Sequence, residues 1–105
     1  MVKKKILKGA FVKVVSERYP LHKKRGGGQV KIEAWENKKG EIVKYSFAYV
    51  NHAVYPGDNG RVFGYDNTHG FHHKHYFGEI AAVEDFKSYE DLLERFEIEL
   101  RTFIQ

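Results

Sequence analysis

The chain has 105 residues, of which 42% are hydrophobic and none is cysteine. This length is enough for one packed domain and too short for two, so we expect a single domain over residues 1–105. The absence of cysteine excludes disulfides and thiolate metal sites and is typical of proteins of the reducing cytoplasm. The sequence contains no apolar run that could span a bilayer and no signal peptide, so we expect a cytoplasmic protein without a membrane partner.

Charge is distributed unevenly along the chain. The formal net charge is +4, but residues 1–39 carry ten Lys and two Arg against three Glu, a balance of +9. Residues 40–105 carry six basic and eleven acidic residues, a balance of −5. A basic half can attract phosphate groups. Lysines on exposed strands also prevent edge-to-edge pairing, so the charge indicates a polyanion-binding surface without establishing one.

The first half of the chain predicts two strands joined by a basic loop. Residues 6–19 and 29–37 alternate between side chains suited to opposite faces of a sheet. The loop over residues 20–28 contains three consecutive glycines, which permit positive φ angles. Residues 37–40 have the composition of a turn, with glycine where a left-handed conformation is needed.

The second half predicts three further strands and a helix. Residues 41–50 form the next alternating strand, and after a loop rich in Pro, Gly, Asp and Asn, residues 61–66 form a short one. Residues 67–70 have the composition of a tight turn. Residues 71–77 alternate again and are expected to return as a partner strand, with an extension to residue 83 left open.

One helix is predicted, starting after Ser88. The Ser88 hydroxyl can cap the helix, with Asp91 in the third helical position. The apolar residues that follow share a helical spacing and form one stripe, from which Ile98 departs. Short turns between successive strands favour an antiparallel arrangement. We therefore predict an α+β fold in which an antiparallel β-meander of about five strands packs against one C-terminal amphipathic helix.

Four of the six histidines stand close together, at His69, His72, His73 and His75. If they lie on a strand, His73 and His75 share one face and stand about 7 Å apart, whereas His72 faces away and is expected to be exposed to solvent. Two converging imidazoles suit a metal ion, with His69 or Asp66 as a third ligand. They equally suit a phosphodiester, with one ring as general base and the other as general acid.

Cleavage of RNA requires a base, an acid and positive charge near the phosphate, and this protein offers all three. The candidate catalytic residues are His73 and His75 as the acid and base, with His69 and Asp66 beside them. The candidate RNA-binding or phosphate-binding residues carry a positive charge or an aromatic ring: Arg61, Lys74, Tyr65, Tyr76, Lys23, Lys24 and Arg25. The leading hypothesis is a metal-independent endoribonuclease with no cofactor.

Other interpretations of the same residues stay open. Turn formation explains part of the run from Asp66 to Gly70, because Asp, Asn and Gly favour turns for backbone reasons. A non-catalytic module that binds nucleic acid or a protein partner would use the basic residues at positions 3–5 and 23–25, and its affinity would fall steeply with salt. The third possibility is a protein that holds a metal ion through its histidines.

A longer motif surrounds these histidines. Residues 60–67 read Gly-Arg-Val-Phe-Gly-Tyr-Asp-Asn, followed by His69-Gly70 and by His73-Lys74-His75-Tyr76. In this run the chain resembles the TumE family, whose pattern is roughly R-L/V-x-G-Y-D-N-x-H-G, a short spacer and H-x-H. The chain departs from the pattern in the spacer, where Phe71 and His72 stand in place of Gly-Asp. If that acidic residue matters, Asp66 is the residue that can take its role.

The resemblance implies a function beyond what the residues alone indicate. TumE proteins are small toxins of bacterial and archaeal toxin–antitoxin modules, encoded beside a helix-turn-helix antitoxin. The resemblance therefore implies a toxin that slows growth by acting on RNA or on translation. It also implies a helix-turn-helix antitoxin as a partner and RNA as the target, and a homodimer is left open.

Overall fold

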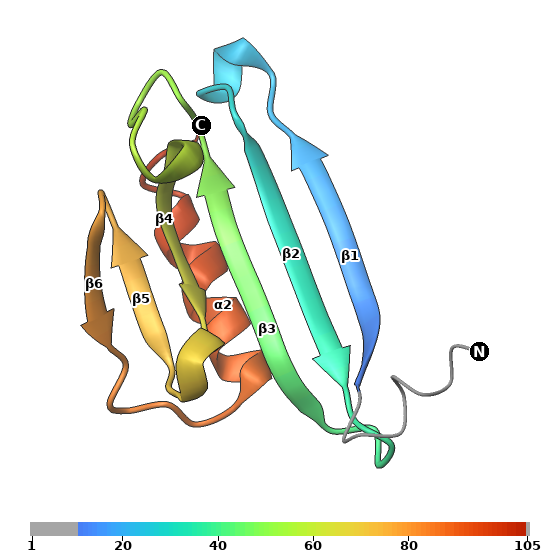
Figure 1. The fold of residues 1–105 in the computed structure, drawn as a ribbon. Coiled ribbons are helices and arrows are strands. Elements are labelled where there is room, and N and C mark those ends of the chain that lie inside the picture. Colours follow the sequence, from blue (N-terminus) through green and yellow to red (C-terminus); the bar gives the residue numbers. More distant parts are fainter. Residues whose placement is uncertain (1–10, 105) are drawn as a thin grey trace.

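The computed structural model describes residues 11–104. In this part of the chain, six strands form one antiparallel sheet in chain order, and one α-helix covers one of its faces (Figure 1). These elements are β1 (Val12–Pro20), β2 (Gln29–Glu36), β3 (Ile42–Val50), β4 (Arg61–Asp66), β5 (His73–Tyr76), β6 (Glu79–Ala82) and α2 (Tyr89–Leu100). The predicted α+β meander with a C-terminal helix is confirmed.

The described residues form six strands and not five, because the chain turns within residues 71–83. The sequence analysis expected one strand there, with a possible extension to residue 83. β5 ends at Tyr76, and the backbone reverses at Phe77 and Gly78, whose φ angles are 47° and 85°. β6 then runs back along β5 as a hairpin. Two-residue turns of this kind are usually signalled by Asn-Gly or Asp-Gly. Phe77 stands at the first position of this turn, and for that reason sequence analysis did not predict the turn.

The loops contain three short 3₁₀ helices, at Lys23–Arg25, Asp58–Gly60 and Thr68–Gly70. The last of them is the tight turn that was predicted between β4 and β5. The predicted first strand corresponds to β1, although its residues 6–10 lie outside the described residues.

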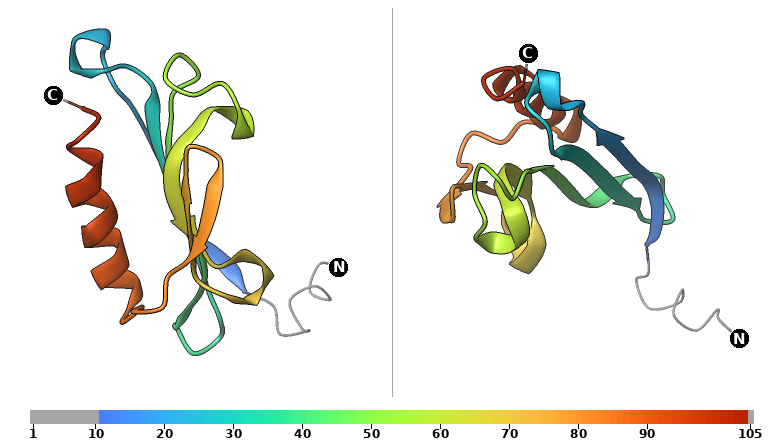
Figure 2. Two further views of the ribbon diagram at one scale, coloured as in Figure 1. Left: turned by 90° about the vertical axis from the view of Figure 1, so that its left-hand side faces the viewer. Right: turned by 90° about the horizontal axis from the view of Figure 1, so that it is seen from above.

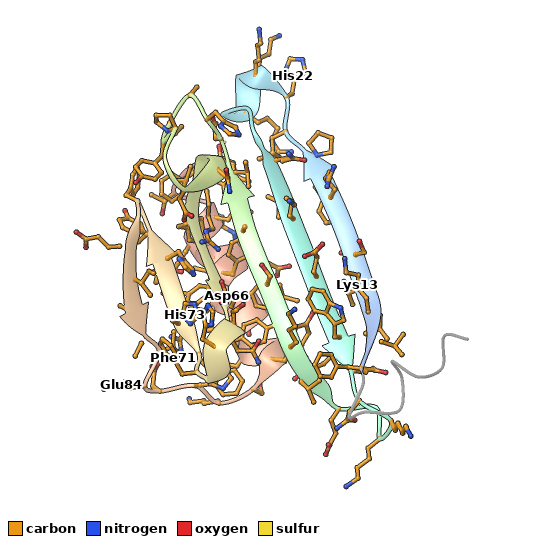
Figure 3. The ribbon with its side chains drawn as sticks, in the orientation of Figure 1. Lys13, His22, Asp66, Phe71, His73 and Glu84 are labelled. Carbon is orange, nitrogen blue, oxygen red and sulfur yellow. The ribbon has the colours of Figure 1, made fainter. Side chains whose placement is uncertain are left out.

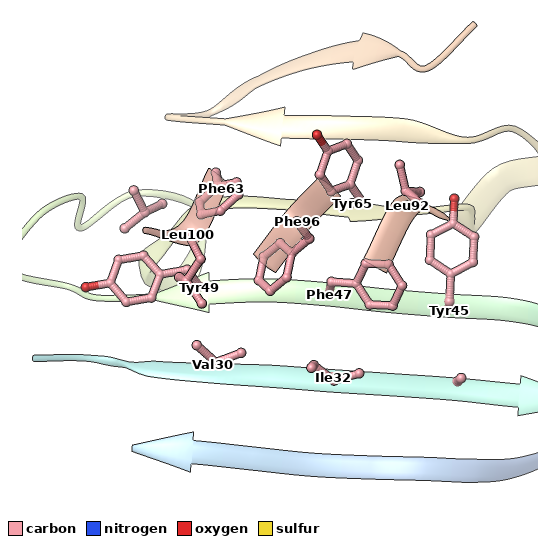
Figure 4. Packing of buried hydrophobic residues seen from close by; sticks show 12 residues of the cluster. Val30, Ile32, Tyr45, Phe47, Tyr49, Phe63, Tyr65, Leu92, Phe96 and Leu100 are labelled. Atoms are coloured by element: carbon pink, nitrogen blue, oxygen red, sulfur yellow. The ribbon is translucent and has the colours of Figure 1, made fainter. Parts of the chain in front are cut away.

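Helix α2 supplies one side of the hydrophobic core. The Ser88 hydroxyl accepts a hydrogen bond from the backbone N–H of Asp91 at 3.0 Å, which confirms the predicted cap. The buried residues of the helix recur every four positions, at Leu92, Phe96 and Leu100, so they form one stripe against the sheet (Figure 4). No helix within residues 11–104 is long and apolar enough to cross a membrane.

The sheet side of the core consists of aromatic side chains of β3 and β4 together with Val30, Ile32 and Ala34 of β2 and Val62 of β4. The ring of Phe96 lies 5.8 Å from that of Phe47 and 5.0 Å from that of Phe63, measured between centroids. All three side chains are almost completely buried. Ile98, which departs from the apolar stripe, is 54% exposed, so it takes no part in this core.

The sheet therefore has two different faces, and α2 covers one of them (Figure 2). Along β4, Phe63 and Tyr65 point to the helix, so Gly64 and Asp66 point to the opposite side. We call that opposite surface the open face. Directly paired residues of neighbouring strands share it, and on β1 to β5 these include Lys13, Ser16, Arg18, Lys31, Glu33, Trp35, Lys44, Ser46, Ala48, Gly64, Asp66, His73 and His75.

Candidate functional site

Asp66, His73 and His75 come together on the open face, where β4 and β5 pair (Figure 3). His73 lies directly opposite Asp66, and His75 lies opposite Gly64, one position further along the same face. The Nε2 atom of His73 is 2.8 Å from Oδ1 of Asp66, and the Nε2 atom of His75 is 3.0 Å from Oδ2. One carboxylate thus binds both imidazoles of the H-x-H motif.

The Asp66 carboxylate is buried, and four donors surround it. Besides the two histidines, the backbone N–H of Thr68 donates to Oδ1 at 3.0 Å, and a guanidinium nitrogen of Arg61 lies 3.4 Å from Oδ2. Arg61 is itself held by Asp58, with which it forms hydrogen bonds of 2.8 and 3.2 Å. A buried carboxylate requires such partners, because burying an unpaired charge is costly. Arg61 therefore positions Asp66.

His73 uses both of its ring nitrogens within the protein. Nε2 faces the Asp66 carboxylate, and Nδ1 lies 3.0 Å from the backbone carbonyl of Phe71. The Phe71 ring also packs against the imidazole at 4.6 Å between centroids. Both neighbours of the ring nitrogens are hydrogen-bond acceptors, so the two contacts fix the orientation of the imidazole.

His75 differs from His73 because only one of its nitrogens has a protein partner. Nε2 binds Asp66, whereas Nδ1 has no hydrogen bond within residues 11–104. No buried side-chain nitrogen or oxygen in this part of the protein lacks a partner, so Nδ1 must be reached by solvent. Burial lowers the pKa of His75 and the nearby Arg61 lowers it further, against the opposing effect of Asp66. At neutral pH the ring is therefore uncharged and offers a lone pair at Nδ1.

His72 lies on the helix side of the sheet, as the alternation predicted, but it is not exposed. Its Nδ1 atom is 2.7 Å from the Tyr45 hydroxyl, and its ring stacks on Phe86 at 3.6 Å. The expectation of a solvent-exposed His72 is therefore wrong. The reason is that Phe86, in the segment before α2, folds back over the ring. Burial, followed by the neighbouring His73, lowers the pKa of His72.

These lowered pKa values predict that the protein becomes less stable in mild acid. In the unfolded chain each ring has a pKa of about 6.5, so the unfolded state binds more protons than the folded state just below that pH. The free energy of unfolding should therefore fall as the pH drops below about 6.5. Urea denaturation at several pH values measures this slope. The slope should be smaller in His72→Gln and unchanged in His69→Asn, and an unchanged slope in His72→Gln would contradict the assignment.

Three of the predicted RNA-binding residues lie on the helix side, away from the histidine pair. The Lys74 ammonium binds Glu99 of α2 at 2.8 Å, and the Tyr65 hydroxyl donates to the same carboxylate at 2.6 Å. The Lys74 ammonium also lies 5.5 Å from the ring centroids of Tyr65 and Tyr76. The sheet therefore stands between these three side chains and His75.

The remaining candidates lie outside the cluster as well. His69 occupies the exposed turn after β4 with a φ of 68°, and it makes no hydrogen bond or ion pair within the described part of the chain. Lys23, Lys24 and Arg25 form the exposed 3₁₀ helix between β1 and β2. The His22 label marks that helix at the end of the sheet far from Asp66 in Figure 3. Of the predicted site residues, the structure thus brings together His73, His75, Asp66 and Arg61.

Sequence analysis did not identify two groups that contribute to the cluster. Asp58 orients Arg61 from the loop before β4, where Asp beside Asn and Gly read only as turn composition. The Phe71 carbonyl binds His73, and a backbone atom leaves no trace in the sequence. The available sequence signal was the spacing of Asp58 and Arg61, three residues apart, because Arg61 begins the strand that ends at Asp66.

Comparison with known proteins assigns the chain to a family. A family model described as Toxin TumE matches residues 21–104, which include all of β2 to β6, helix α2 and the histidine cluster. No curated protein and no solved structure matches the chain. Because the match covers most of the sequence and contains the motif around Asp66, the chain belongs to the TumE family of toxins.

Proposed function

We propose that the chain is the toxin of a toxin–antitoxin module and cleaves RNA at the cluster of Asp66, His73 and His75, without a metal ion. The observation that carries this proposal is the asymmetry of His75. One of its nitrogens is held by a buried carboxylate, and the other is uncharged and has no hydrogen-bond partner within residues 11–104. This is the arrangement of a general base that a carboxylate orients.

The reaction that suits one such base is attack by the 2′-hydroxyl on the adjacent phosphate. Nδ1 of His75 accepts the proton of the 2′-hydroxyl while the 2′-oxygen forms a bond to phosphorus. The bond between phosphorus and the 5′-oxygen breaks, and the 5′-oxygen takes a proton from solvent. The proton on His75 then returns to solvent. The products are a 2′,3′-cyclic phosphate and a 5′-hydroxyl.

In this mechanism the two histidines have different tasks, although the sequence treats them alike. Asp66 accepts from Nε2 of His75, which favours the tautomer in which Nδ1 carries the lone pair. His73 and Arg61 bind the same carboxylate and hold it in place. Arg61 also brings positive charge close to the phosphate, where negative charge develops during the reaction.

The family description supports the biological part of the proposal. It names a toxin, and a toxin implies an antitoxin that restrains it. We propose that this antitoxin is a helix-turn-helix protein and that both proteins act in the cytoplasm, where RNA is available.

A growth assay tests the proposal in the cell. Induction of the wild type should arrest growth, and induction of His73→Ala/His75→Ala should not. A matched control replaces two exposed histidines, His52→Ala with His69→Asn, and should arrest growth like the wild type. Circular dichroism checks that all three proteins fold. Growth arrest by a folded His73→Ala/His75→Ala variant would show that the toxicity has another source.

The pH dependence of cleavage provides a test of His75 as the base. The rate should rise with pH and level off above the pKa of His75, because only the uncharged ring accepts a proton. Burial and Arg61 lower that pKa, so the midpoint should lie below about 6.5. Arg61→Gln removes a positive charge and should move the midpoint to higher pH. Initial rates of cleavage measured from about pH 5 to 8 give this midpoint. A midpoint at lower pH in Arg61→Gln than in the wild type would contradict the assignment of His75 as the base.

One observation favours a second candidate function, in which the cluster holds a divalent cation. The ligand atoms of Asp66, His73 and His75 lie within 4.8 Å of one another, and two imidazoles with one carboxylate are a known donor set. The Phe71 carbonyl is also a typical second partner for a metal-bound histidine. Elemental analysis of protein purified without a histidine tag tests this candidate. Stoichiometric metal, together with cleavage that a chelator abolishes, would replace the metal-independent mechanism.

A further inference from the structure

Within β1 to β5, a continuous row of paired residues crosses the open face and reaches His75, which itself pairs with Ile80 of β6. Arg18 of β1 pairs with Lys31 of β2, and Lys31 pairs with Ala48 of β3. Ala48 pairs with Gly64 of β4, and Gly64 pairs with His75 of β5. Directly paired residues share a face, so two cations stand at one end of the row and His75 at the other. Three strand spacings separate Lys31 from His75, about 14 Å.

The middle of this row carries two small residues, Ala48 and Gly64, and both are buried. A groove of about 230 Å³ lies beside them, lined by Lys31 and Arg61, by the acidic residues Glu33 and Asp58, and by Ser46, Ala48, Val50 and Asn59. The backbone requires the glycine, because a Cβ atom at Gly64 would clash with the Phe47 carbonyl oxygen. The groove therefore extends from Lys31 to Arg61, whose guanidinium contacts Asp66 of the catalytic cluster.

The two cations at the start of the row face each other without a shared counterion. Like charges directly opposite on neighbouring strands destabilise a sheet. Arg18 and Lys31 form no ion pair within residues 11–104, whereas Lys13, five positions before Arg18 on β1, binds Glu33 at 3.0 Å. A phosphate group between the two side chains would relieve this repulsion. The pair thus points to an anionic ligand on the open face.

The open face also carries an aromatic surface, in a row separated from that of Lys31 by the row of Glu33. Trp35 of β2 pairs with Lys13 on one side and with Lys44 on the other. The ammonium groups of these lysines lie 5.1 and 4.5 Å from the Trp35 ring. The indole ring can stack on a nucleobase, and the ammonium groups beside it can neutralise phosphates of the RNA backbone.

From these observations we infer that the open face binds single-stranded RNA as an extended track that leads to His75. Arg18 and Lys31 bind backbone phosphates, the strand crosses the sheet along the groove between Lys31 and Arg61, and Trp35 stacks on a base. The bond that is cleaved lies beside His75. This inference rests on the proposed function, because it takes His75 as the end of the track. The negatively charged strand matches the positive charge of Arg18 and Lys31.

The affinity for RNA is measured on a variant that cannot cleave, so that the contribution of the track to binding is separated from catalysis. The background is His75→Gln, and the probe is a single-stranded RNA oligonucleotide. Trp35 is the only tryptophan in the chain, so its fluorescence reports directly on the track. Quenching on titration with RNA is expected. Affinity is measured at several salt concentrations, with the same RNA carrying a fluorescent label.

The test variant is Arg18→Gln/Lys31→Gln, and the matched control is Lys87→Gln/Arg101→Gln, which removes the same charge from exposed positions on either side of α2. The dissociation constant of the test variant should rise at least tenfold, and its salt slope should fall by about 1.4, because each phosphate contact on a single strand contributes about 0.7. The control should keep the salt slope of the background. Trp35→Leu should weaken binding at least fivefold, as expected for the loss of one stacked base.

The outcomes distinguish this inference from the proposed function. If Arg18→Gln/Lys31→Gln binds like the control, or if RNA leaves the Trp35 fluorescence unchanged, the track is wrong even when the wild type cleaves RNA. If binding depends on Arg18 and Lys31 but the wild type never cleaves, the track stands and the catalytic proposal fails. In the cleaving protein, the same double substitution should raise KM and leave kcat unchanged. A lower kcat with an unchanged KM would also overturn the track.

Discussion

Replacing His75 by glutamine is expected to reduce the rate of RNA cleavage by about 10²–10⁴-fold, the usual contribution of a general base. Glutamine keeps a similar size and can donate to Asp66, but it cannot take the proton of a 2′-hydroxyl at neutral pH. The loss should therefore appear in kcat, because the track that binds RNA is unchanged. Single-turnover kinetics with a labelled oligonucleotide measure it directly.

Two further variants show whether the loss is specific to the base. His69→Asn removes an exposed imidazole from the turn beside the site and should cleave at the wild-type rate. Asp66→Asn keeps the shape of the side chain but removes the charge that orients both rings, so its rate should also fall. A His75→Gln variant within a few-fold of the wild type would show that another group takes the proton.

Replacing Phe96 by alanine is expected to lower the free energy of unfolding by about 3–5 kcal/mol. The ring is completely buried and contacts Phe47 and Phe63, the aromatic residues through which α2 packs on β3 and β4. Its removal leaves a cavity where α2 packs on β3 and β4, in the middle of the stripe that also contains Leu92 and Leu100 (Figure 4). Because small domains are stable by about 5–15 kcal/mol, this one change should bring the protein close to unfolding at physiological temperature.

Ile98 provides the matched control on the same helix. Its side chain is 54% exposed, so Ile98→Ala should change the free energy of unfolding by no more than about 0.5 kcal/mol. Urea denaturation followed by circular dichroism measures both variants. Equal losses in the two variants would mean that α2 does not pack against the sheet through Phe96.

The sequence predicts much of the fold because its signals are local. The alternation of residues 71–77 places His73 and His75 on one face and His72 on the other, and the structure confirms that division. The spacing of apolar residues after Ser88 likewise predicts the helix and the face that it buries. Periods of two and of about four residues depend only on neighbouring positions.

The parts that could not be predicted depend on long-range pairing. Asp66 meets both histidines because β4 and β5 pair in one particular register, which the turn between them sets. The same register sends Lys74 to the helix side, where Glu99 binds it. Arg18 and Lys31 stand opposite each other only once β1 pairs with β2. Composition shows that these charges are present but not that they share a surface with His75.

The central claim is that the cluster of Asp66, His73 and His75 cleaves RNA by itself, and the product ends of one reaction test it most directly. Wild-type protein without a histidine tag is incubated with a single-stranded RNA oligonucleotide in an excess of chelator, beside the His75→Gln variant. We expect the wild type to produce 2′,3′-cyclic phosphate and 5′-hydroxyl ends and the variant to produce none. An intact oligonucleotide after incubation with folded wild type, or products that appear equally with His75→Gln, would contradict the account.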